Sequence, residues 1–184
     1  LKVDLFKDEI FVFTPAGDVT PLPANSTPID FAFQVHSQVG IHCIGAKVNG
    51  KIVPLNMVLK NGDSIEILTS NTQKPSYAWL KFVQTGKAKS HIKRWVKKEQ
   101  TEQSIQLGKE IIEKTLRRMK RISILDELQA KPQTMGFNQV ELVYAALANG
   151  QLTVRDIIDK YQPVDYNEQD FDPESQSLTE RFIN

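Results

Sequence analysis

Short runs of alternating apolar and polar residues dominate the first seventy positions of the chain and predict β-strands. β-branched and aromatic residues fill 10–13, a Pro- and Gly-containing turn follows at 14–18, and a second short strand is expected at 19–22. The alternation returns at 44–48, where the Asn-Gly pair at 49–50 is a strong signal for a tight hairpin. Two more short strands are predicted at 52–53 and 65–67.

Between the second and third predicted strands the apolar period changes to that of a helix. We expect Thr27 to cap this helix, with Pro28 in its first turn and Asp30 completing a capping box. Its inner stripe comprises Ile29, Ala32, Phe33, Val35 and His36. Gly40 is the expected stop. The helix follows two predicted strands and precedes a hairpin and a last short strand, and this ββαββ type of order predicts a β-grasp (ubiquitin-like) unit of the α+β class over 7–71.

After Pro75 the pattern becomes helical and predicts a separate, small all-α domain over 76–161. The helices expected there are a short one at 77–83, an amphipathic one through Ala88, Ile92, Trp95 and Val96, a longer one over 105–119, and two capped ones near Asn138 and Thr153. The tail over 162–184 has six acidic residues against Arg181 alone, and we expect it to be disordered. The apolar runs are too short for a membrane-spanning helix, so no membrane partner is expected.

A net charge of +1 conceals an uneven distribution of charge. Residues 81–98 contain seven lysine and arginine residues and no acidic residue. Five of them, Lys87, Lys89, Lys93, Arg94 and Lys97, lie on the helix face opposite Ile92 and Trp95. A row of cations suits a phosphate backbone, because each neutralised phosphate releases counterions. The alternative is a solvated helix face, although the complete lack of acidic residues weakens that interpretation.

His36 is a second candidate, because a histidine at a helix end can stack on a base or bond a phosphate or ribose. A packed, hydrogen-bonded histidine is the alternative. The spacing of His36, His42 and Cys43 fits no zinc pattern, so no metal or other cofactor is predicted. Catalytic residues are not predicted either, since phosphate-binding loops, dinucleotide fingerprints and nucleophile elbows are missing. The single Cys43 excludes an internal disulfide and fits a reducing cytoplasm.

The first seventy residues resemble a TGS domain. The resemblance is carried by Val12-Phe13-Thr14-Pro15, Gly17-Asp18, Thr27-Pro28-Ile29-Asp30-Phe31-Ala32, Val35-His36, Ala46-Lys47-Val48-Asn49-Gly50 and Gly62-Asp63. The continuation resembles the long RelA/SpoT-type synthetase/hydrolases of guanosine tetra- and pentaphosphate, (p)ppGpp. The residues that carry it are Lys74-Pro75-Ser76, Trp79-Leu80, Lys87-Ala88-Lys89-Ser90 and Leu107-Gly108-Lys109-Glu110. Together the two resemblances cover about residues 7–161.

The resemblance implies the regulatory C-terminal region of a stringent-response enzyme, a GTP pyrophosphokinase and (p)ppGpp 3′-pyrophosphohydrolase whose catalytic domains precede this region. In family members that sense starvation, the TGS domain contacts the 3′-CCA end of uncharged tRNA on the ribosome, and the family's contacting histidine matches His36. The implied function is to sense uncharged tRNA and to relay its presence to catalytic domains of the same chain. The alternative is a protein-interaction module, which docks acyl carrier protein or those catalytic domains.

Overall fold

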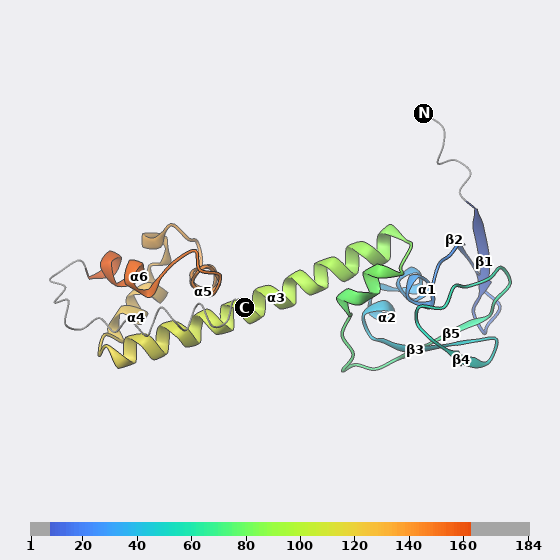
Figure 1. Cartoon of the computed structure of the whole chain (residues 1–184), viewed down its shortest axis with the longest axis horizontal. Helices are drawn as coiled ribbons and strands as arrows, with labels where there is room; N and C mark the ends of the chain where they lie inside the picture. The colour runs from blue at the N-terminus through green and yellow to red at the C-terminus, as the bar shows by residue number, and fades with distance from the viewer. Residues whose placement is uncertain (1–7, 163–184) are drawn as a thin grey trace, which may run out of the picture. The chain divides into compact units, whose positions relative to one another are not determined.

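The computed structural model describes residues 8–162, which divide into two compact units (Figure 1). The first unit ends at Lys98 and the second begins at Glu99. All but the first residue of the predicted tail, 162–184, lies outside the described residues. Within 8–162, no helix combines the length and the apolar character that crossing a bilayer requires.

The first unit is built on five short strands in two sheets, whose bounds are β1 Glu9–Phe13, β2 Val19–Pro23, β3 Cys43–Val48, β4 Lys51–Val53 and β5 Ile65–Thr69. β1 and β2 form one antiparallel pair, and β3 lies between β4 and β5 in the other sheet. A parallel bridge between Phe13 and Ser64 connects the two sheets. The predicted hairpin is confirmed, because Asn49 and Gly50 both have positive φ, of 52° and 82°, as a type I′ turn requires.

The prediction of a single helix up to Gly40 is wrong in one respect. The chain forms two helices there, α1 Pro28–Val35 and α2 Ser37–Ile41. The break is at His36, whose φ of −166° and ψ of 145° are extended. Nδ1 of the His36 ring accepts a hydrogen bond from the Gln38 N–H and so caps the second helix. As a result Val35, expected in the inner stripe, is half exposed.

Two apolar clusters hold the first unit together. One fills the space between the sheets and α1, and comprises Val12, Leu22, Phe31, Val48, Leu59 and Ile65. The other joins α1 and β3 to the segment after Pro75, and comprises Ile29, Ala32, Phe33, Cys43, Trp79, Val83, Ala88 and Ile92. That segment contains the 3₁₀ helix η2 Tyr77–Lys81 and the start of the long helix α3 Gly86–Arg118. The predicted boundary between 71 and 76 therefore differs from the division after Lys98, because residues 77–92 complete the β-grasp core.

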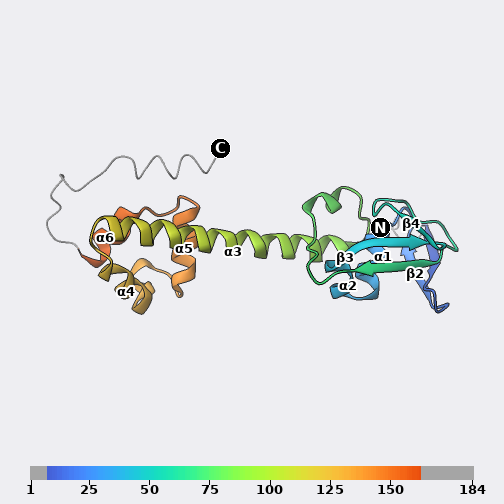
Figure 2. The ribbon, with the colours of Figure 1, turned by 90° about the horizontal axis from the view of Figure 1, so that it is seen from below.

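The second unit is helical, with the later part of α3 followed by α4 Ser123–Ala130, the 3₁₀ helix η3 Pro132–Met135, α5 Val140–Ala148 and α6 Val154–Tyr161. These elements gather around that part of α3 (Figures 1 and 2). Its core residues are Ile112, Leu116, Ile124, Leu125, Leu128, Val143, Tyr144, Leu147, Ile157 and Ile158. The helices predicted at 88–96 and 105–119 are one continuous helix, and α4 and η3 were not predicted.

The predicted α+β class, with a β-grasp unit followed by helices, is thus confirmed.

Candidate nucleic-acid interface

The five predicted cations lie on the first half of α3 and all are exposed. Lys89, Lys93 and Lys97 follow one another at four-residue intervals, about 6 Å apart along the helix axis. Lys87 and Arg94, seven residues apart, lie beside this row. The opposite side of the helix carries Ala88 and Ile92, both fully buried. The five cations therefore form one face, which we call the basic face.

The basic face belongs to the same compact unit as His36. Residues 8–98 contain eleven lysine and arginine residues against six aspartate and glutamate residues. Residues 99–162 contain nine of each. All of the excess positive charge in the described chain thus resides in the β-grasp unit, where a polyanion is attracted most strongly.

Asp30 connects the start of α1 to the residues that precede α3. Its side chain is completely buried. Oδ2 accepts hydrogen bonds from the Thr27 N–H at 2.9 Å and the Thr27 hydroxyl at 3.1 Å. Oδ1 accepts from the Gln84 N–H at 2.9 Å, the Thr85 N–H at 2.8 Å and the Thr85 hydroxyl at 3.0 Å. The carboxylate that was predicted only to complete a capping box therefore also binds residues 54 and 55 positions later in the chain.

A second contact between α1 and α3 lies further along both helices. The rings of Phe33 and His91 stack with centroids 5.7 Å apart and an interplanar angle of 11°. Gly40 provides the space for Phe33, since a Cβ at Gly40 would overlap the Phe33 ring. The basic half of α3 is thus held to α1 by a polar contact at its start and by ring packing two turns later.

The His36 side chain is exposed and ends α1. Its backbone N–H donates to the Ala32 carbonyl at 3.2 Å, and its Nδ1 accepts from the Gln38 N–H at 3.0 Å. Because Nδ1 is an acceptor, the neutral ring carries its proton on Nε2. Within residues 8–162 Nε2 has no hydrogen-bond partner, so His36 presents one N–H donor to solvent.

Five aromatic side chains of the first unit could stack on bases if they were exposed, but most are part of the core. Phe31, Phe33 and Trp79 are buried, and Phe82 and Trp95 are partly buried. The Lys74 ammonium lies over the Trp95 ring, 5.8 Å from its centroid, and so occupies one face of that ring. These positions contribute packing within the first unit rather than open stacking surfaces.

Two other features of the molecule offer no site for chemistry. Among the described residues, no three His, Cys, Asp or Glu side chains gather as metal ligands. Cys43 is fully buried, and burial raises the pKa of its thiol to about 11, which is the opposite of what a nucleophile needs. The predicted interpretation of Cys43 as a core residue is confirmed.

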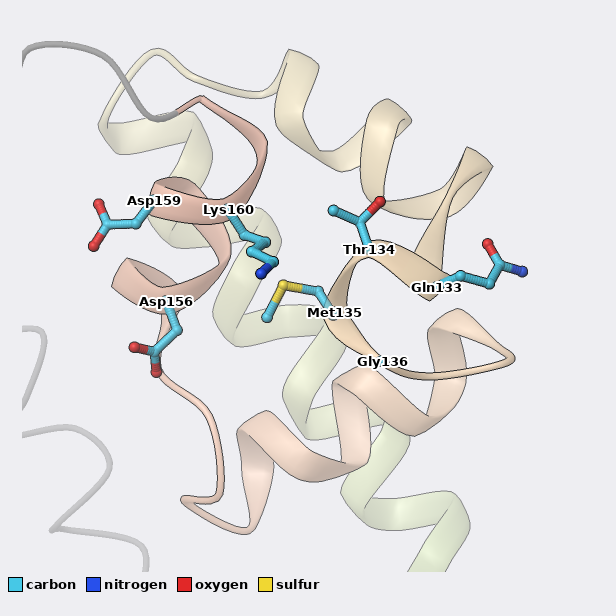
Figure 3. Close-up of a pocket in the computed structure, with 7 residues that line it drawn as sticks. All are labelled: Gln133, Thr134, Met135, Gly136, Asp156, Asp159 and Lys160. Carbon is cyan, nitrogen blue, oxygen red and sulfur yellow. The ribbon is translucent and has the colours of Figure 1, made fainter.

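The second unit contains an open pocket of about 550 Å³ beside η3 and α6. Figure 3 shows Met135 and Lys160 pointing toward each other across it, with Asp156 and Asp159 on the same helix as Lys160. Asp156 already accepts hydrogen bonds from the N–H and hydroxyl of Thr153, which hold the pKa of its carboxyl below the usual value. None of the predicted contact residues lies here, and two carboxylates at its rim do not suit a polyanion.

Asp30, Thr85 and His91 were not among the predicted site residues. Nothing in the local sequence links Asp30 to Thr85, because the contact spans 55 positions. The Thr-Gly-Lys order at 85–87 does contain a signal for a helix start, since threonine is a favoured cap. Thr85 Oγ1 indeed accepts from the Ala88 N–H at 3.2 Å.

The two compact units correspond to two known domains. Residues 10–69 match the TGS domain and residues 95–162 match the RelA/SpoT AH domain. A β-grasp TGS unit followed by a helical AH unit is therefore the class that this arrangement defines.

The curated relatives of the chain are much longer proteins, which it matches over most of its own length. A protein from Myxococcus xanthus named GTP pyrophosphokinase is 44% identical over 167 residues, which cover 89% of this chain and 22% of the relative. A guanosine-3′,5′-bis(diphosphate) 3′-pyrophosphohydrolase from Aquifex aeolicus is 42% identical over 86% of this chain and 23% of its own length. The bifunctional (p)ppGpp synthase/hydrolase RelA of Mycobacterium tuberculosis is 37% identical over 87% of this chain and 22% of its own length.

The chain is therefore a TGS domain followed by a RelA/SpoT AH domain, similar over most of its length to RelA/SpoT-type proteins, as its sequence predicted. It spans about a fifth of the length of the relatives that it matches.

Proposed function

We propose that this chain is a regulatory region of a (p)ppGpp synthetase/hydrolase, and that it senses uncharged tRNA through the 3′-CCA end on the ribosome. The region relays the presence of that tRNA to catalytic domains elsewhere in the longer protein. The names of the relatives support the choice of enzyme, since they describe the synthesis and the hydrolysis of the same nucleotide.

The observation that carries the proposal is the co-location of two different contacts in one compact unit. The basic face offers five exposed cations, which suit an RNA backbone. His36 offers a single N–H donor on an exposed ring, which suits an oxygen or nitrogen acceptor on an unpaired nucleotide. A tRNA acceptor arm contains both a duplex backbone and a single-stranded 3′ end, so one ligand engages both contacts.

The test of the basic face is the affinity for uncharged tRNA over a salt series. We expect the charge reversals Lys93→Glu and Arg94→Glu together to weaken binding and to reduce the slope of log K against log salt by about two. The matched control is the pair Lys51→Glu and Lys60→Glu, two exposed lysines of the same unit that lie outside α3. Equal losses in both pairs would mean that net charge, and not the basic face, attracts the RNA.

The test of His36 separates the two nitrogens of its ring. His36→Asn keeps a side-chain acceptor for the Gln38 N–H, because asparagine is a good helix cap, but it removes the Nε2–H donor. We expect this variant to be as stable as the wild type and to lose about 0.5–1.5 kcal/mol of affinity for tRNA, the value of one hydrogen bond. Unchanged affinity would contradict a contact through Nε2.

A protein partner is the rival function, because an acidic acyl carrier protein would also suit the basic face. The two partners differ at His36. Acyl carrier protein has no single-stranded nucleotide, so its binding would fall with Lys93→Glu and Arg94→Glu and would be unaffected by His36→Asn. That pattern, together with an absence of tRNA binding, would favour the interaction module.

A further inference from the structure

We propose that Asp30 is a positioning residue for RNA binding. Its carboxylate fixes the basic half of α3 to α1, so that one ligand meets the basic face and His36 as parts of a single rigid surface. This inference rests on the proposed function, because it concerns how the same two contacts are held together.

The hydrogen bonds of Asp30 come from two separate segments of the chain. Thr27, at the start of α1, donates its N–H and hydroxyl to Oδ2. Gln84 and Thr85, directly before α3, donate two N–H groups and one hydroxyl to Oδ1. A carboxylate has about four acceptor sites, so protein groups alone satisfy this one. A buried charge held in this way connects the two helices with defined geometry.

Thr85 transmits this contact to the helix that bears the cations. Its hydroxyl donates to Asp30 at 3.0 Å and accepts from the Ala88 N–H at 3.2 Å. Its carbonyl accepts from the Lys89 N–H at 3.1 Å. The first turn of α3 is thus oriented by the residue that Asp30 holds, and the same turn contains the first cations of the basic face.

The relation between the two proposed contacts depends on this connection. His36 is attached to the end of α1 through its N–H bond to Ala32, whereas Lys93 is carried by α3. If α1 and α3 are fixed to each other, His36 keeps one position relative to the basic face. An RNA bound by the basic face then presents its 3′ end to a histidine that is already in place. Binding of the second contact then costs less conformational entropy.

The experiment uses two synthetic RNA minihelices that differ only in a single-stranded 3′-CCA end. The quantity measured is the affinity for the minihelix with the CCA end divided by the affinity for the minihelix without it, for the same protein. A wild-type ratio of roughly two- to tenfold is expected if His36 contributes one hydrogen bond to the CCA end. Asp30→Asn offers one acceptor oxygen in place of two, so either Thr27 or Thr85 loses its acceptor, whereas the Gln84 N–H, which bonds both oxygens of Asp30, keeps one. In this variant the ratio should fall towards one, while the minihelix without CCA binds as before.

Thr85→Val and Thr85→Ser provide a second pair of variants, in which the buried carboxylate is intact. Valine keeps the shape of threonine but removes the hydroxyl that bonds Asp30 and Ala88, whereas serine retains it. We expect a reduced ratio in Thr85→Val and the wild-type ratio in Thr85→Ser. Faster exchange of the amide at position 85 in Thr85→Val and Asp30→Asn would report that the connection has loosened.

A merely structural role gives a different result, because a smaller folded fraction weakens binding of both minihelices by the same factor and leaves their ratio unchanged. A wild-type ratio that persists in Asp30→Asn and Thr85→Val would overturn the positioning role alone. A ratio of one in the wild type would instead contradict the proposed contact of His36 with the CCA end, and the two failures are therefore distinguishable.

Discussion

Gly108 lies where α3 crosses α5 so closely that no side chain fits. A Cβ at Gly108 would overlap the backbone carbonyl of Tyr144. Backbone atoms cannot move aside by a change of rotamer, so Gly108→Ala must separate the two helices of the second unit at this contact. Overpacking of this kind costs about 1–3 kcal/mol, and we take the upper value because the obstacle is backbone.

The gain in helix propensity offsets part of this cost. Alanine is better than glycine in a helix interior by about 1 kcal/mol. The net expectation for Gly108→Ala is a loss of about 2 kcal/mol in the free energy of unfolding. For a unit of this size that loss lowers the melting temperature by about 8–16 °C.

The assay is thermal unfolding followed by circular dichroism at 222 nm, with Gly86→Ala as the matched control. Gly86 begins the same helix, and a Cβ there meets no atom within 4 Å, so this variant should be neutral or slightly stabilised. Both tryptophans, Trp79 and Trp95, belong to the first unit, and their fluorescence should show a smaller shift in Gly108→Ala. A Gly108→Ala protein as stable as Gly86→Ala would refute the close crossing.

Three further predictions concern single side chains. Gly40→Ala should lower the free energy of unfolding of the first unit by about 1–3 kcal/mol, because the added Cβ overlaps the Phe33 ring, and an unchanged midpoint of tryptophan fluorescence in urea would contradict this packing. Cys43, whose pKa is about 11, should react with a thiol reagent at pH 8 at least ~100-fold more slowly in the native protein than in urea; similar rates would contradict its burial. Asp156 has a lowered pKa in the folded state, so its cap bonds add stability above the unfolded pKa, and that stability is lost as the pH falls below about 4. Thr153→Val should therefore destabilise the protein more at pH 7 than at pH 3 in urea unfolding, and an equal loss at both would count against the carboxylate's contribution.

Much of the local chemistry of turns and caps was predictable from the sequence, but the cap expected near Asn138 is wrong, because α5 begins after Gln139 without a side-chain cap. Asn49 and Gly50 form the expected turn because both adopt positive φ, which few other residue pairs accept so readily. Thr153 and Asp156 form the expected capping box, whose three-residue spacing fixes the partners in advance. Features of this kind depend only on neighbouring residues.

The continuity of α3 was not predictable from its apolar period, because residues 97–104 contain no apolar side chain. The helix persists there since lysine, glutamate and glutamine are good helix formers and no glycine or proline interrupts them. At His36 the reverse occurs, because the apolar period continues but the helix ends. A side chain within an apparently regular stripe bonds the backbone two residues later and starts a new helix.

The division between the units depended on contacts between distant residues. Trp79 and Val83, and likewise Ala88 and Ile92, have the four-residue spacing of a helix face whichever core they join. Only packing against Ile29, Ala32, Phe33 and Cys43 assigns them to the β-grasp unit. The basic face is therefore part of the same unit as His36, and this is the basis for treating the two as one candidate interface.

The most direct test of the account compares uncharged with aminoacylated tRNA. Binding of each to the chain should be measured in the presence of ribosomes, for the wild type and for His36→Asn. The wild type should bind uncharged tRNA more tightly, and His36→Asn should lose this preference while it retains affinity from the basic face. Equal affinity of the wild type for both forms of the tRNA would contradict the central claim.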